Sequence, residues 1–207
     1  MRLLDRAVLR EGNQAPSLPN TYDSFLGKQI AFRRGEVSMI AGQPGAGKST
    51  LALALAVRAR VSTLYFSADT HAHTMSLRLI SMLTGVTQDQ AEPMMMRDKT
   101  WASEILSDAR HIRWSFESAP SMRDIETELA AHIELTGESP ELVVVGNLVD
   151  CVGGDGDEWG SLRNMMKDFK WLAREHECSF VVLHHTSEGV QGNPCPPRFS
   201  LQGKVAQ

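Results

Sequence analysis

The sequence predicts an α/β fold with a mostly parallel central sheet and helices on both faces. Short apolar runs alternate with helical stretches along most of the chain. Residues 142–145 and 180–183 contain no polar side chain, which is typical of strands buried on both faces of a parallel sheet. A third, mostly apolar run at 37–41 leads into a glycine-rich loop and then into strong helix formers. This alternation implies right-handed βαβ crossovers.

Local patterns place the individual elements. The expected strands are residues 29–32, 36–41, 62–67, 111–116, 141–145 and 179–183. The expected helices run from the glycine loop to about residue 60, and over residues 70–84, 101–109, 121–137 and 159–176. Ser121 and Asp124 form a capping box at the start of one helix. Residues 87–97 are predicted to be irregular because Pro93 falls among them.

Length and composition limit the possible classes. The 207 residues suffice for one domain (26–207), preceded by an N-terminal arm or linker (1–25). A net charge of -4 disfavours a protein that coats duplex DNA along a basic face. Three cysteines without zinc spacing indicate reduced thiols. With no signal peptide or bilayer-length apolar stretch, we expect a soluble cytoplasmic protein without a membrane partner.

The glycine-rich loop matches the phosphate-binding pattern G-x-x-x-x-G-K-[ST], or Walker A motif. Its residues, all candidates for nucleotide binding, are Gly42, Gln43, Pro44, Gly45, Ala46, Gly47, Lys48, Ser49 and Thr50. A strand, a glycine loop and a helix N-terminus together form an anion site of backbone N–H groups. We expect Lys48 to reach the outer phosphates of ATP and Ser49 to coordinate Mg2+.

Four further segments, 65–69, 142–149, 162–173 and 181–185, give the chain a resemblance to a known family. Together with the loop, they resemble the RecA-like P-loop motor domain of DnaB-like hexameric replicative helicases, particularly the compact phage and plasmid versions. The resemblance implies ATP and Mg2+ as cofactors, single-stranded DNA as a partner, and assembly into a homo-oligomer, with the hexamer of that family as the expected form. It runs from about residue 26 to 207, and the family's last strands are expected to be missing.

Asp69 matches the family's catalytic carboxylate, which is usually Glu. A carboxylate at this position orients and partly deprotonates the water that attacks the γ-phosphate. The alternative is that Asp69 caps the helix that follows it, since Asp is favoured at helix starts.

The second acidic position departs from the family's pattern, in which Asp follows four apolar residues. Here Gly146 follows them and has no ligand atoms. Either Asn147 or Asp150 binds the metal from a shifted position, or Ser49 and the nucleotide hold Mg2+ without them. Asp150 has an alternative role as the start of a Gly/Asp-rich loop. In each case we expect weaker hydrolysis than in a family member that has the carboxylate.

His185 matches the family's polar sensor at the end of the strand beside the nucleotide. Alternation along a strand puts His184 on the opposite sheet face, so only one of the two can contact the γ-phosphate. By the same resemblance, residues 188–199 correspond to a DNA-binding loop, with Arg198 and Phe199 as its contacts. A surface loop without that role is the alternative. Lys204 or Arg198 is a candidate for acting in a neighbouring active site.

The resemblance favours an ATP-dependent DNA helicase motor, with Lys48, Asp69 and His185 as its catalytic residues. Gly146 and the low basic content favour a second function, an ATP-binding assembly or loading protein that does not unwind DNA. A small-molecule kinase fits the same loop but less well, because no arginine-rich lid is present.

Overall fold

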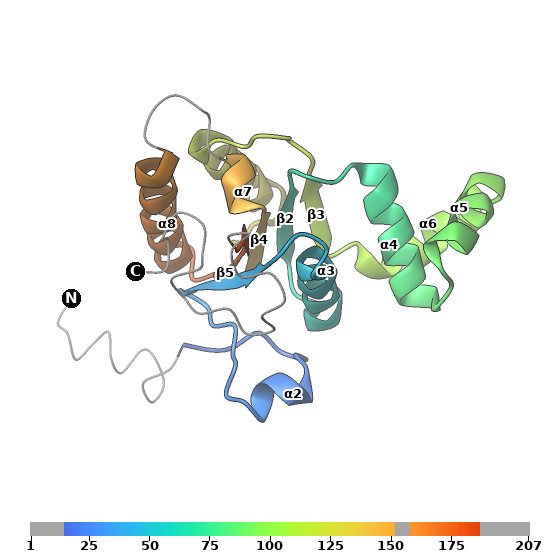
Figure 1. Ribbon diagram of the computed structural model, residues 1–207, viewed down its shortest axis with the longest axis horizontal. Helices are drawn as coiled ribbons and strands as arrows, with labels where there is room; N and C mark the ends of the chain where they lie inside the picture. Colours follow the sequence, from blue (N-terminus) through green and yellow to red (C-terminus); the bar gives the residue numbers. More distant parts are fainter. Residues whose placement is uncertain (1–14, 152–157, 187–207) are drawn as a thin grey trace.

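The computed structural model describes residues 15–151 and 158–186, which form a parallel sheet covered by helices on both faces (Figure 1). The strands are β1 (Val37–Gly42), β2 (Thr63–Ser67), β3 (Ile112–Ser115), β4 (Leu142–Gly146) and β5 (Ser179–His185). Their order across the sheet is β1-β5-β4-β2-β3, and every pairing is parallel. The predicted fold class is confirmed.

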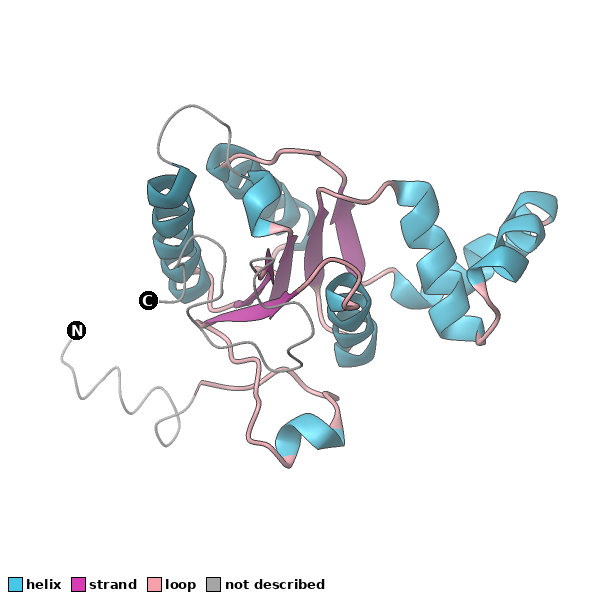
Figure 2. Cartoon of the chain, in the orientation of Figure 1, coloured by secondary structure: helices cyan, strands magenta, loops and turns pink. Residues whose placement is uncertain are grey.

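The helices of the described residues form three groups around the sheet, and the short α2 stands apart from them (Figure 2). They are α2 (Asp23–Leu26), α3 (Lys48–Ala59), α4 (Ala72–Thr84), α5 (Gln88–Arg97), α6 (Lys99–Leu106), α7 (Met122–Thr136) and α8 (Glu158–Glu175), with 3-10 turns η2 (Ser107–Ala109) and η3 (Leu148–Cys151). Helix α3 packs on one sheet face and α7 and α8 on the other, while α5 and α6 stand beside α4 at the edge (Figure 1).

Successive side chains along each strand point to opposite faces of the sheet. Tyr65, Val144 and Val181 pack in the cluster with α3, whereas Phe66, Val145 and Val182 pack with α7 and α8. These central residues are at most 1% exposed, so burial of apolar side chains on both faces stabilises the sheet. The sheet then fixes which loops meet at its carboxyl edge.

One predicted strand is absent. Gln29 ends the turn 27–29 that follows α2, residues 30–32 lie in neither a helix nor a strand, and the Ile30 N–H donates to the Phe25 carbonyl at 2.8 Å. Gln29 has φ +58°, in the left-handed region, which is incompatible with extended backbone. The apolar pattern reflects instead the packing of Phe32 in the core, where the Leu18 N–H donates to its carbonyl at 2.8 Å.

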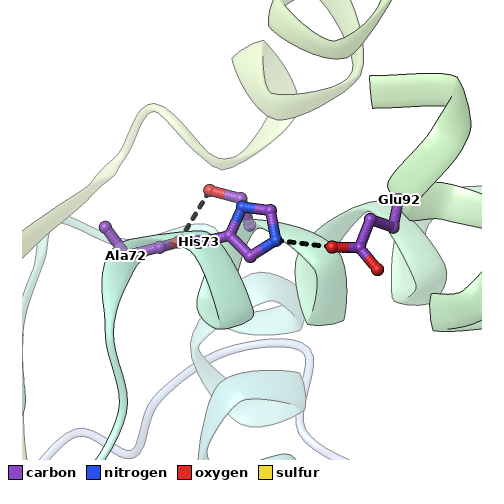
Figure 3. A network of polar contacts seen from close by, with 4 residues as sticks. Ala72, His73 and Glu92 are labelled. Atoms are coloured by element: carbon purple, nitrogen blue, oxygen red, sulfur yellow. Dashed lines mark hydrogen bonds and ion pairs between the residues drawn. The ribbon is translucent and has the colours of Figure 1, made fainter. Parts of the chain in front are cut away.

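The irregular segment predicted at 87–97 is a helix, α5, with Pro93 inside it. Thr87 and Gln90 form a capping box at its start, and Ala91 is fully buried among α4 and α6. The exposed His73 of α4 also lies 3.1 Å from Glu92 of α5 (Figure 3). Capping and packing therefore outweigh the cost of a proline within a helix. The sequence pattern alone did not predict this helix.

Candidate functional site

A pocket of about 350 Å³ lies at the carboxyl edge of the sheet. Because β5 lies between β1 and β4, and β2 follows β4, this edge brings together the segments that end four neighbouring strands. The pocket is lined by loop residues including Gly45, Lys48 and Ser49, and also by Asp69 and His185. The predicted loop, acid and histidine therefore converge, although they are distant in sequence.

The loop after β1 has a shape that suits an anion. Gly45 and Gly47 have φ +78° and +82°, where a side chain would strain the backbone. Gly47 precedes α3, whose first N–H groups have no acceptor inside the helix. Those N–H groups belong to Lys48, Ser49 and Thr50, which all line the pocket. Pocket size and donors therefore fit the phosphates of a nucleotide.

Lys48 lies folded against its own loop. Its Nζ donates to the carbonyl oxygens of Gly42 and Gln43, each at 3.0 Å, and lies 3.2 Å from Nδ1 of His185. Burial lowers the pKa of Lys48 from its ordinary value of 10.5, and the Asp69 carboxylate opposes that shift. Gly42 and Gln43 do not line the pocket; their carbonyl oxygens hold the Lys48 ammonium in place.

The strand register selects His185 over His184 as the pocket histidine. His185 pairs with Gly42 at the ends of β5 and β1 and lines the pocket, whereas His184 is completely buried. Burial and the Lys48 ammonium lower the pKa of His185, while Asp150, Asp69 and a bond to Gly42 oppose the shift. A neutral ring that accepts from Lys48 at Nδ1 carries its proton on Nε2.

Asp69 is held at both oxygens. Thr70 Oγ1 donates to Oδ1 at 3.0 Å, and Asn147 Nδ2 donates to Oδ2 at 3.1 Å. Helix α4 is not capped by Asp69: its N-cap is His71, and no side-chain cap bond is present there. The capping interpretation is therefore wrong, and the carboxylate lies fixed beside the pocket instead.

Gly146 ends β4 opposite Ser67 of β2. A Cβ placed on Gly146 would lie 2.9 Å from Cδ1 of Leu183, which is 1% exposed. Leu183 therefore fills the space that a side chain at 146 would enter. The next residue, Asn147, is 4% exposed, lines the pocket and holds Asp69.

The predicted metal ligands lie apart. Ser49 lines the pocket, but Asp150 sits in η3 outside the lining, near enough to His185 to affect its pKa. Within residues 15–151 and 158–186, no group of three or more His, Cys, Asp or Glu side chains could hold a metal ion by itself. A cation here would need the nucleotide's oxygens beside the Ser49 hydroxyl. Asp150 as a ligand stays a prediction.

Sequence reasoning missed Arg78. This α4 side chain lines the pocket, and its Nη1 donates to Thr70 Oγ1 at 3.4 Å, next to Asp69. One signal was available: Arg78 is the only lysine or arginine between Arg60 and Arg97. The residues predicted to contact DNA or a neighbouring site, Arg198, Phe199 and Lys204, lie outside the described residues.

Two histidines predict how stability depends on pH. Burial lowers the pKa of His132 and of His185 from the ordinary value of 6.5. The unfolded chain then binds more protons than the folded one below that value, so the free energy of unfolding should fall as the pH drops from 7.5 to 5. Urea unfolding at several pH values checks this expectation. His132→Gln should flatten the dependence relative to the unaltered protein; an unchanged slope would contradict it.

The comparisons with known proteins agree with this geometry. Residues 29–190 match the model of an AAA domain family, AAA_25. Gene 65 protein of Mycobacterium phage L5 is 31% identical over 203 residues, covering 95% of this chain and 75% of that protein. Gene 65 protein of Mycobacterium phage D29 is 33% identical over 175 residues, covering 82% of this chain and 75% of that protein.

Solved structures show the same fold. A solved ATPase domain matches with a TM-score of 0.81 at 16% identity, covering 99% of this chain and 77% of that one. A DnaB-like replicative helicase, studied with its interactions with primase, matches with a TM-score of 0.76 at 15% identity and 97% coverage of this chain. Our chain spans 51% of that helicase chain. No helix in the described residues has the length and apolar composition needed to cross a membrane.

These findings confirm the resemblance drawn from the sequence: the chain belongs to the AAA domain family AAA_25 and has the RecA-like P-loop fold of DnaB-like helicase ATPase domains.

Proposed function

We propose that this protein binds and hydrolyses ATP at the pocket, as the motor of an ATP-dependent DNA helicase. The observation that carries the proposal is the convergence of Lys48, Asp69 and His185 around one pocket beneath a phosphate-binding loop. Within the loop 42–50, the residues that line the pocket hold the phosphates through backbone N–H groups and the Lys48 ammonium, and Gly42 and Gln43 position that ammonium. Mg2+ bound with ATP would offset the negative charge of the phosphates, and the Ser49 hydroxyl would be a ligand from the chain.

Asp69 is the residue that orients and deprotonates the attacking water. Its bonds from Thr70 and Asn147 fix the carboxylate before a nucleotide arrives, which favours catalysis because little reorganisation is then needed. Arg78 lies beside this carboxylate and adds a positive charge to the pocket. In this proposal Asp69 acts as a general base, which typically contributes about 10²–10⁴-fold to the rate.

His185 is the residue that senses the γ-phosphate. His185 Nδ1 lies 3.2 Å from the Lys48 ammonium, and the phosphates of ATP would attract the same ammonium. ATP that draws Lys48 outward would leave His185 Nδ1 without that donor. Because His185 is the last residue of β5, we propose that this change is relayed to residues 188–199 and that these residues contact single-stranded DNA.

The surrounding assembly is also a proposal. We infer a homo-oligomer, of hexamer type, from the family resemblance and the match to a DnaB-like helicase fold. A second candidate function is favoured by Gly146 and Leu183: an ATP-binding loading protein with slow hydrolysis, since the usual carboxylate position is filled by an apolar side chain.

One set of assays separates the two functions. We would measure ATP turnover with and without single-stranded DNA, strand displacement on a forked duplex, and the mass of the assembly. A helicase motor shows DNA-stimulated turnover and displaces the strand. Tight ATP binding without displacement supports the loading protein, and the absence of ATP binding contradicts both.

Restoring a carboxylate tests why hydrolysis should be weak. Gly146→Asp alone must displace the Leu183 side chain, so we expect a loss of about 1–3 kcal/mol in the free energy of unfolding. Gly146→Asp with Leu183→Ala provides space for the carboxylate, and ATP turnover should then exceed that of Leu183→Ala alone. Urea unfolding and steady-state ATPase assays check both expectations. No gain in turnover would contradict the expectation that the missing carboxylate limits hydrolysis.

A further inference from the structure

The outer face of α8 carries four cations, which we call the basic face of α8. Its residues are Arg163, Lys167, Lys170 and Arg174, and all four side chains are exposed. At about 100° per residue they fall within an arc of about 60°, along about 16 Å of helix. The apolar side chains Leu162, Phe169 and Leu172 point the opposite way and are at most 2% exposed. Figure 1 shows α8 at the margin of the molecule, on the sheet face opposite α3.

The four charges repel one another and are not neutralised within the described residues. None of them takes part in the ion pairs found there, which join Arg34 to Glu141, His73 to Glu92 and Arg113 to Glu128. Lys167 donates only to the neutral amide of Asn164, at 3.5 Å.

This spacing costs stability. The pairs 163/167, 167/170 and 170/174 stand three or four residues apart, where like charges destabilise a helix by a few tenths of a kcal/mol each. The whole chain has a net charge of -4, so a cluster of four positive charges is not explained by a generally basic composition. The four cations lower the stability of the helix and have no anionic partner among the described residues, which suggests that they bind an anion outside the chain.

An aromatic side chain flanks the basic face. Trp171 is 57% exposed, although tryptophan is usually largely buried. The two acids of this stretch, Asp168 and Glu175, lie about 100° or more from the centre of the basic face. A line of cations beside an exposed indole is the combination that binds single-stranded nucleic acid, through phosphates and base stacking.

We propose that the basic face of α8 binds the backbone of single-stranded nucleic acid, with Trp171 stacking on an unpaired base. None of the residues of this surface lines the nucleotide pocket, so the proposal does not depend on the proposed ATP hydrolysis. A lipid surface fits less well, because the apolar side of α8 is buried in the core and cannot enter a bilayer interface.

The first test compares two charge changes of equal size. Lys167→Gln/Lys170→Gln removes two cations from the basic face, and Arg97→Gln/Lys99→Gln removes two exposed cations from α5 and α6. Binding of a fluorescent oligo-dT is followed by anisotropy, without ATP, over a range of salt. Each lost phosphate contact lowers the slope of log affinity against log salt by about 0.7. We expect a decrease of about 1.4 for the α8 variant and none for the control.

The second test concerns the indole. Trp171→Ala should weaken oligo-dT binding at least about fivefold, and Trp171→Phe should recover most of it, because either ring offers a face for stacking. A duplex of the same length should respond to the lysine changes but not to Trp171→Ala. Circular dichroism confirms that each variant is folded.

Clear outcomes would overturn the proposal. Equal slopes for the α8 variant and its control, or no binding of oligo-dT, place nucleic acid elsewhere or exclude it. Binding to phosphatidylglycerol vesicles that depends on the basic face, with none to oligo-dT, would assign the face to a membrane. ATP turnover measured in the same preparations shows whether the nucleotide pocket works regardless of these results.

Discussion

Replacing Lys48 with alanine is expected to lower ATP turnover by at least about 100-fold, the scale of losing one preorganised donor at a transferring phosphoryl group. Among the described residues, Lys48 is the only lysine that lines the pocket, and its Nζ donates to the loop carbonyls of Gly42 and Gln43. No other lysine of the described residues can replace its charge there. Steady-state phosphate release gives the measurement.

A matched control isolates the charge from general damage. Lys28→Ala removes an exposed lysine outside the pocket and should keep full turnover. Lys48→Ala must also stay folded, which urea unfolding checks, since Lys48 is largely buried. Turnover of Lys48→Ala at the level of Lys28→Ala would show that hydrolysis occurs at another site or comes from a contaminant.

Asp69→Asn should lower turnover by about 10²–10⁴, the usual contribution of a general base, while ATP affinity changes little. The change removes the negative charge but keeps the size of the side chain. The new side-chain amide has only one oxygen, so its NH2 group must face the donor of Asn147 or Thr70 and one of the two hydrogen bonds is lost. We therefore also expect a small decrease in the free energy of unfolding. Single-turnover hydrolysis, with the protein in excess over ATP and at a concentration that saturates binding, separates the chemical step from binding.

The control for this prediction is Asp89→Asn, which alters an exposed acid in the first turn of α5. It should leave both turnover and affinity unchanged. If Asp69→Asn instead lost ATP affinity and turnover in equal measure, Asp69 would act in binding the nucleotide. Unchanged turnover would leave Asp69 a structural partner of Asn147.

The parts of the site that depend on local sequence were predictable. The glycine pattern of residues 42–50 defines its own loop, because Gly45 and Gly47 occupy left-handed backbone that other residues avoid. Strands such as β4 were equally predictable, since a strand that is buried on both faces appears in the sequence as a continuous apolar run.

The parts that depend on contacts between distant segments were not predictable. Asn147 and Asp69 are bonded across 78 residues, and only the pairing of β2 with β4 brings them together. Arg78 reaches the pocket only because α4 packs over the sheet edge. The choice of His185 over His184 needed the register with Gly42, and the role of Leu183 beside Gly146 needed the packed core.

The central claim is that one ATP binds to each chain at the carboxyl edge of β1 and β5, held by the Lys48 ammonium. Isothermal calorimetry with Mg·ATP tests it most directly, comparing the unaltered protein with Lys48→Ala. Loss of a charge-assisted hydrogen bond to phosphate should weaken affinity at least about tenfold. We expect one site per chain in the unaltered protein and that loss in the variant. Equal affinity in the two proteins, or no binding to either, would contradict the account.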